Sequence, residues 1–82
     1  MVKIVDENKK LLVDLITCKL INDGFVEKSV FVPSSAEVQL ICKDGAKKIC
    51  QLFKEKGFNV SYYNSVTVVY PIVTIDVSKD FK

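Results

Sequence analysis

The sequence predicts an α+β fold, a two-layer α/β sandwich in which two helices lie on one face of a three-stranded mixed sheet. Two amphipathic stretches each end at a glycine followed by phenylalanine, first at Gly24 and Phe25 and again at Gly57 and Phe58. Glycine closes a helix at little steric cost, and the next residue can pack back on the last turn. Residues with high β propensity follow each pair. We therefore expect the order α-β-α-β-β in a single domain spanning residues 1–82.

The first helix is expected over residues 8–23, after a short extended arm at residues 1–5. Apolar residues recur there at spacings of three and four, which predicts the stripe that packs on the sheet. The predicted stripe consists of Leu11, Leu12, Leu15, Ile16, Cys18 and Leu20. Asp6 and Glu7 favour the start of this helix through its dipole.

The second helix is expected over residues 35–56. Ser34 and Glu37 have the spacing of a capping box, in which each side chain bonds a free backbone N–H group of the first turn. Apolar residues then keep a helical period as far as Lys56.

The weak point of this second helix is Gly45, which follows Asp44. An alternative interpretation has a strand at residues 36–42 and a shorter helix that begins at Asp44. We favour the continuous helix because the apolar phase is kept across Gly45, which would lie on the packing face.

Three strands are expected, at residues 26–32, at residues 58–63 and within residues 66–77, where Pro71 marks a strand start, an edge or a bulge. The first two would be parallel and joined by a right-handed crossover through the second helix. The last strand is the most apolar, so we place it in the middle, in the spatial order 1-3-2. The other face of the sheet then has no helix to cover it.

The residue types argue against catalysis. The chain has no histidine, which is the commonest general base and metal ligand, and it has no phosphate-binding glycine motif and no paired-cysteine zinc pattern. We therefore expect no enzyme activity, no catalytic residue, no cofactor and no metal site. Asp76 lies in an apolar strand, and we expect it on the solvated face of the sheet.

The three cysteines, Cys18, Cys42 and Cys50, are odd in number and lie in apolar helical patterns. This is typical of buried free thiols in a reducing compartment, so we expect a cytoplasmic protein. The segment 57–75 has no charge and approaches membrane-spanning length, but its polar and β-branched residues favour strands. We therefore expect no membrane segment.

The net charge is +2, and every basic residue is lysine. Arginine is the residue suited to bidentate contacts with phosphate and guanine, so its absence disfavours sequence-specific nucleic-acid binding. The alternative function is non-specific nucleic-acid binding, in which the tyrosines stack on bases. The lysines that would attract the phosphates are Lys9, Lys10, Lys47 and Lys48.

One cluster of aromatic and aliphatic residues is larger than a hydrophobic core requires. Tyr62, Tyr63 and Tyr70 are all the tyrosines of the chain, and Val66 and Val68 lie among them. Tyrosine is enriched at interfaces, so these five residues are the predicted partner-binding site. The competing interpretation is that alternate members line the core. With an open sheet face, a homo-oligomer formed through sheet faces or edges is expected.

The second half of the chain, residues 31–77, resembles small phage-type accessory proteins with a helix–strand–helix–hairpin pattern. The resemblance lies in the segments VPSS, GFNVS and YPIVTI and in the helix between the first two. It carries no catalytic residue. The resemblance implies a small module that binds a protein of unknown identity. One such module would be a phage-encoded inhibitor that docks stoichiometrically on a host or defence protein. A structural or assembly component is a further alternative.

Overall fold

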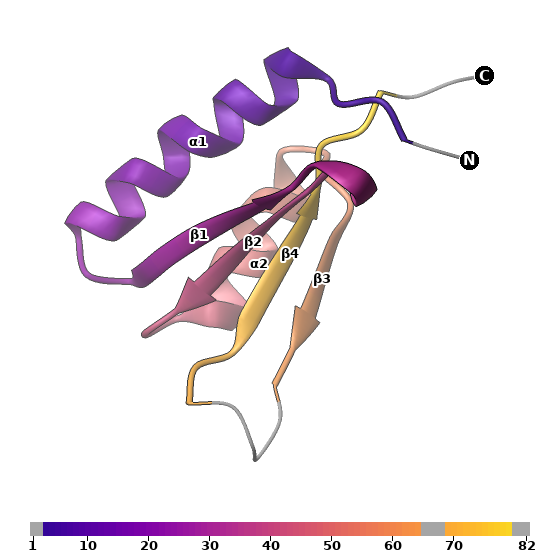
Figure 1. Cartoon of the computed structure of the whole chain (residues 1–82). Helices are drawn as coiled ribbons and strands as arrows, with labels where there is room; N and C mark the ends of the chain where they lie inside the picture. The colour runs from indigo at the N-terminus through magenta and orange to yellow at the C-terminus, as the bar shows by residue number, and fades with distance from the viewer. Residues whose placement is uncertain (1–2, 65–68, 80–82) are drawn as a thin grey trace.

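A computed structural model of the chain describes residues 3–64 and 69–79 and shows six main elements around one core (Figure 1). They are α1 (Glu7–Asn22), β1 (Val26–Val32), β2 (Glu37–Cys42), α2 (Ala46–Glu55), β3 (Val60–Tyr63) and β4 (Ile72–Asp76), with a 3₁₀ turn at Pro33–Ser35. The four strands form one antiparallel sheet in the order β1-β2-β4-β3. Both helices contribute to one core cluster, α1 against β1 and β2 and α2 against β3 and β4.

The expected three-stranded mixed sheet with the order 1-3-2 is wrong. Residues 37–42, which we assigned to the second helix, form β2, and this strand pairs with β1 on one side and β4 on the other. Its burial alternates, with Val38, Leu40 and Cys42 buried and the residues between them half-buried. A period of two is the pattern of a strand, and pairing on both edges satisfies its backbone groups. We also expected residues 26–32 and 58–63 to run parallel on either side of the last strand, but β1 and β3 run in opposite directions because every neighbouring pair in the sheet is antiparallel.

The predicted capping box is replaced by a chain reversal. The Ser35 hydroxyl donates a hydrogen bond to the Glu37 carboxylate at 2.9 Å, and the Ala36 N–H group bonds the Pro33 carbonyl at 3.2 Å. Ala36 takes the left-handed conformation, with φ 51°, and turns the chain from β1 into β2. The second helix begins only after Gly45, as in the alternative interpretation that we had ranked second.

A bulge in β1 separates Val26 from the later residues of the strand. The register with β2 shifts between Val26 and Lys28, so Val26 lies in the core. Lys28 and Val30 pair with Ile41 and Gln39 on the face away from the helices. One extra residue in a bulge reverses the side of the sheet on which the later residues of the strand lie.

The two predicted helix ends are confirmed. After α1, the Gly24 N–H group bonds the Ile21 carbonyl at 3.1 Å and the Phe25 N–H group bonds the Leu20 carbonyl at 3.0 Å. The same pair of bonds follows α2, from Gly57 and Phe58. Both glycines have positive φ, as this cap requires. The Phe58 ring also packs edge-on against Phe53, with ring centroids 6.0 Å apart.

The predicted packing stripe of α1 is only partly correct: Ile16 and Leu20 pack against the core, but the other four residues of the stripe are exposed. Val13 and Thr17 face the core, whereas Leu11, Leu12 and Leu15 are 59%, 44% and 62% exposed. Cys18 is exposed as well, which corrects its expected burial, although Cys42 and Cys50 are buried as expected. Apolar residues lie on both sides of α1, so periodicity alone did not identify the side that packs.

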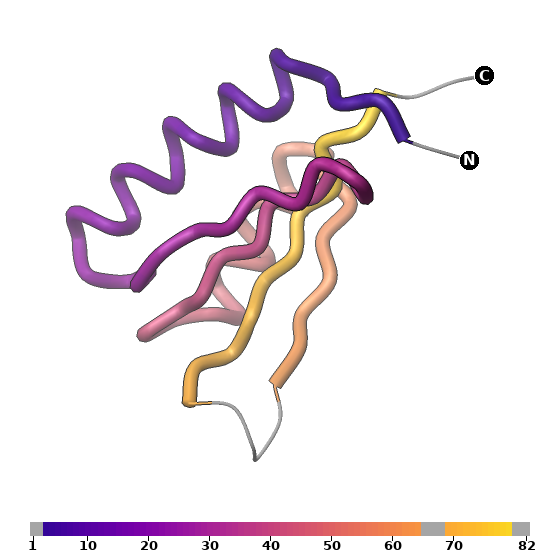
Figure 2. The backbone as a smooth tube through the Cα atoms, viewed as in Figure 1, coloured from indigo at the N-terminus to yellow at the C-terminus, as the bar shows by residue number. Residues whose placement is uncertain are grey.

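The two ends of the described chain lie side by side (Figure 2). Val5 forms a β-bridge with Ser78, and the Asp6 N–H group bonds the Val77 carbonyl at 2.8 Å. Asp6 also caps α1, because its carboxylate accepts from the backbone N–H groups of Asn8 and Lys9. The N-terminal arm thus ties α1 to the end of β4.

Thr17 is expected to be a site where a substitution stabilises the fold. Its hydroxyl is buried against the core and has no hydrogen-bond partner among the described residues. Thr17→Val keeps the shape and removes the unsatisfied group, so the free energy of unfolding should rise by about 1–2 kcal/mol. Urea denaturation checks it. Thr74→Val, on the open face of the sheet, is the control and should be close to neutral; a loss of stability in Thr17→Val would contradict the assignment.

Candidate functional site: an apolar groove between the helices

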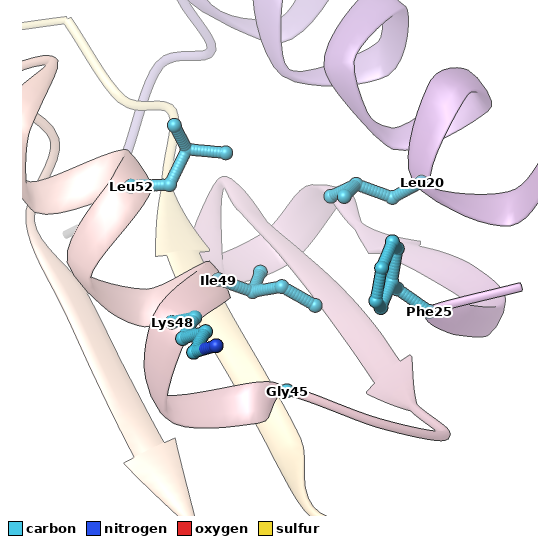
Figure 3. Close-up of a pocket in the computed structure, with 6 residues that line it drawn as sticks. All are labelled: Leu20, Phe25, Gly45, Lys48, Ile49 and Leu52. Carbon is cyan, nitrogen blue, oxygen red and sulfur yellow. The ribbon is translucent and has the colours of Figure 1, made fainter. Parts of the chain in front are cut away.

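A groove opens between α1 and α2 on the helical side of the molecule (Figure 3). Its six lining residues are Leu20, Phe25, Gly45, Lys48, Ile49 and Leu52. In Figure 3, Leu20 and Phe25 point across the opening toward Ile49. Lys48, Ile49 and Leu52 come from successive turns on one side of α2, at the three- and four-residue spacing of a helix face.

The caps of the two helices position these walls. The Phe25 carbonyl accepts two hydrogen bonds, from the Lys43 N–H group at 2.8 Å and the Asp44 N–H group at 3.2 Å. The cap of α1 is thereby joined to the loop that leads into α2. A Cβ atom at position 45 would lie 3.9 Å from the Phe25 ring, which is an ordinary contact, so lack of space does not require a glycine there. The φ of 67° at Gly45 explains the glycine, because this left-handed conformation is strained for other residues. The groove is therefore held by backbone bonds.

The surface of the groove is apolar with one charge at its rim. Ile49 is almost fully buried, Leu20 and Leu52 are half-buried, and the Phe25 ring is 41% exposed. Lys48 is exposed, and no carboxylate of the described residues forms an ion pair with it. An apolar surface beside this cation favours a ligand in which an apolar group lies next to a negatively charged group.

The size of the groove selects the kind of ligand. Its volume is about 260 Å³. Pockets for cofactors and drug-sized ligands measure about 300–1,000 Å³ and enclose most of the ligand. This groove is smaller and open to solvent, so it suits one large side chain of a polypeptide better than an enclosed small molecule.

The predicted tyrosine site lies only partly within the described residues. Tyr62 pairs with Val73 on the helical side of β3, and Tyr63 pairs with Ile72 on the open side. Tyr63 is 55% exposed, and Tyr70 is half-buried. Because neighbouring strand residues face opposite sides of a sheet, Tyr62 and Tyr63 do not share one face.

Val66 and Val68, the other two members of the predicted tyrosine site, lie outside the described residues. The partner-binding role of the five residues stays a prediction.

The lysines of the nucleic-acid alternative are not equally available. Lys9 donates to the Ser78 carbonyl at 2.9 Å, and Lys10 forms an ion pair with Asp14 at 2.7 Å. Lys10 also lies 4.9 Å from the centre of the Phe31 ring. The hydrogen bond that Lys10 donates to the Asp14 carboxylate raises the pKa of Lys10 above its ordinary value, against partial desolvation. Both side chains therefore serve the fold.

Asp76 lies on the face of the sheet away from the helices, opposite Glu37 of β2. It accepts hydrogen bonds from the Ser78 N–H group at 2.7 Å and from Lys3 at 3.3 Å. Desolvation alone would raise the pKa of Asp76, but the bonds from Ser78 and Lys3 outweigh it and lower the pKa below the ordinary value. A carboxylate held ionised in this way is a structural anchor for the C-terminal segment.

The described part of the chain offers no clustered metal ligands and no membrane-spanning helix. No three His, Cys, Asp or Glu side chains within residues 3–64 and 69–79 gather closely enough to hold a metal ion. Over the same residues, neither helix has the length and apolar content needed to cross a membrane.

Comparison of the chain with protein-family models, with curated proteins and with solved structures returned no match. The geometry of the chain itself is therefore the basis for assigning a function.

Sequence reasoning missed the groove because it depends on how α1 and α2 lie against the sheet, and the expected sheet was wrong. With the helix starting at Ala46, the residues Lys48, Ile49 and Leu52 form one face directed at α1. The signal that was available is the Gly24-Phe25 cap, which leaves an aromatic ring beside the end of a helix.

Proposed function

We propose that this protein is a non-enzymatic interaction module that binds a partner polypeptide in the groove between α1 and α2. The observation that supports it is the combination of an apolar, open groove and a lysine at its rim, Lys48, that has no ion-pair partner among the residues the structure describes. A large apolar side chain of the partner fills the space between Phe25 and Leu52. An Asp or Glu close to it in the partner's sequence pairs with Lys48.

This mode of binding needs no chemistry from the protein. Contacts between an apolar anchor and a preformed pocket supply most of the affinity of many interfaces, while rim charges add orientation. Binding is then stoichiometric, which is the behaviour of an inhibitor. A phage-encoded inhibitor of a host or defence protein is the biological role that the sequence resemblance implies. Free cysteines are typical of proteins in a reducing compartment, which supports a cytoplasmic site of action.

The proposal is tested by selecting peptides from a displayed random library on the immobilised protein and measuring their affinity by fluorescence anisotropy. We expect the selected peptides to share one large apolar residue with an acidic residue near it, and to bind one per chain. Leu52→Ser removes an apolar wall, so it should weaken binding by roughly ten- to a hundredfold, the equivalent of about 1.5–3 kcal/mol. Lys48→Glu should weaken it by a smaller factor, because exposed ion pairs contribute little.

Matched controls separate the groove from other surfaces. Lys54→Glu makes the same charge change on α2 at an exposed residue that does not line the groove, and it should leave the affinity unchanged. Thermal melts verify that Leu52→Ser remains folded. Equal affinity of wild type and Leu52→Ser would refute the groove. Loss of binding in Tyr63→Ala and Tyr70→Ala instead would move the site to the β3–β4 hairpin.

A further inference from the structure

The side of α1 that faces away from the sheet is a second apolar surface, distinct from the groove. It is formed by Leu11, Leu15 and Cys18, with Leu12 beside them, and all four are exposed. At 3.6 residues per turn, Leu15 points roughly 160° away from the buried Val13. A partner on this surface therefore stands clear of the sheet. We propose that this outer stripe of α1 pairs with the same stripe of a second copy of the chain, as two parallel helices.

The spacing of the outer stripe is that of a two-stranded coiled coil. Asn8, Leu11, Leu15, Cys18 and Asn22 follow one another at intervals of three, four, three and four residues. In the heptad notation abcdefg, position a is taken by Asn8, Leu15 and Asn22, and position d is taken by Leu11 and Cys18. An asparagine at an a position bonds its counterpart across a parallel pair and thereby specifies register and partner number, at a cost in stability. Here one asparagine stands at each end of the apolar seam.

The charges beside the seam favour a copy in parallel orientation. Asp14, whose carboxylate also accepts from Lys10 of the same helix, occupies a g position on one flank, and Lys19 occupies an e position on the other. Parallel pairing brings Asp14 of each copy toward Lys19 of the other, so two ion pairs form by symmetry. Antiparallel pairing would instead bring the two Asp14 carboxylates toward each other. Lys19 is exposed and has no ion-pair partner among the described residues, so it is free to make this contact.

The size of the surface sets the strength of the dimer. α1 has 16 residues and is about 24 Å long. A pair of such helices buries less than the roughly 800 Å² per partner of a standard interface. The dimer is therefore weak, with dissociation in the micromolar range or above. The groove borders the inner side of α1, so dimerisation leaves one groove open on each copy.

Sedimentation velocity over a concentration series tests the dimer. We expect a monomer near 1 µM and a growing dimer fraction up to several hundred micromolar, on the scale of weak interfaces. Leu15→Glu places a charge in the centre of the seam and should abolish the dimer. Val30→Glu makes an equally polar change on the open sheet face and should leave the dimer intact. A monomer at every concentration, or dimers equally stable in Leu15→Glu, would overturn the proposal.

Two further measurements test the orientation. Asp14→Lys and Lys19→Asp should each weaken self-association, and an equimolar mixture of the two variants should restore it as a heterodimer. Mild oxidation with diamide, which removes two electrons and two protons from a thiol pair, should join Cys18 to Cys18 of the second copy, and Cys18→Ser should prevent this. If the protein dimerises, but the mixture of charge variants does not restore association and Cys18 does not cross-link to Cys18, the dimer is not the proposed parallel pair. Because the groove stays open on each copy of the dimer, the outcome of the peptide-binding experiment is independent of these results.

Discussion

Leu40→Ala is expected to destabilise the protein by about 3–5 kcal/mol, a loss that combines the transfer of the side chain with the cavity left behind. Leu40 is fully buried in the centre of β2, where it pairs with Val73 of β4. A domain of 82 residues has a total stability of about 4–12 kcal/mol. The substitution therefore removes a large share of the folding free energy. Urea denaturation followed by circular dichroism measures it.

The matched control is Leu15→Ala, the same chemical change on the outer stripe of α1. Leu15 is 62% exposed, so the cost should stay within about 0.5 kcal/mol when the protein is dilute and monomeric. This pair of variants discriminates between the structure and the sequence-based expectation, in which Leu15 packed against the sheet. Similar losses in both variants would contradict the packing of α1 described here.

A single fast-reacting thiol is expected in the native protein. Cys18 is exposed, whereas Cys42 and Cys50 are buried. Burial raises the pKa of the Cys42 thiol from 9.0 to about 11, with a smaller opposing effect of the Val73 backbone. At pH 8 roughly one Cys42 in a thousand would be ionised, and the thiolate is the reactive form. Alkylation of Cys42 and Cys50 should be at least about a thousandfold slower than that of Cys18, because it requires unfolding.

Iodoacetamide labelling at about 1 µM protein, with the modified residues located by peptide mass spectrometry, checks this expectation. All three thiols should react in urea, and Cys18→Ser should remove the fast phase. Because folding raises the pKa of Cys42, its neutral thiol stabilises the folded state at pH values below 9. This stabilisation is lost as the pH rises through about 11. Two or three fast thiols in the native protein would contradict the burial of the core cysteines.

The groove and the outer stripe of α1 have different consequences for binding. In the proposed binding mode, the groove accepts one side chain of the partner, and a single contact of this kind gives modest affinity. A dimer through the outer stripe of α1 carries two grooves, and a partner that offers two anchors would gain an effective concentration from the second contact. Variants in Leu15 and Leu52 separate these contributions, because each residue belongs to only one of the two surfaces.

Local signals in the sequence identified the helix ends and part of the core. The Gly-Phe caps at residues 24–25 and 57–58 needed only backbone geometry and one nearby contact, and both are present. The last expected strand was placed in the middle of the sheet because it is the most apolar, and its residues Val73, Ile75 and Val77 are all buried. The candidate site could not be predicted in the same way, because the groove depends on where α2 begins and on how α1 is rotated.

Residues 37–42 show why local pattern failed elsewhere. Val38, Ile41 and Cys42 fit a helical period, while Val38, Leu40 and Cys42 fit the period of a strand. Short apolar segments satisfy both periods. The choice is made by β1 and β4, which supply hydrogen-bond partners along both edges of β2.

By itself, the sequence determined where the helices end, that the C-terminal strand is buried, and that histidine chemistry is excluded. These depend on residue type and on contacts within a few positions of the chain. Only the tertiary structure decided that residues 37–42 are a strand and which side of α1 faces the core. Both outcomes depend on pairing and packing between segments far apart in the sequence, where two local conformations are close in free energy and distant contacts select one of them.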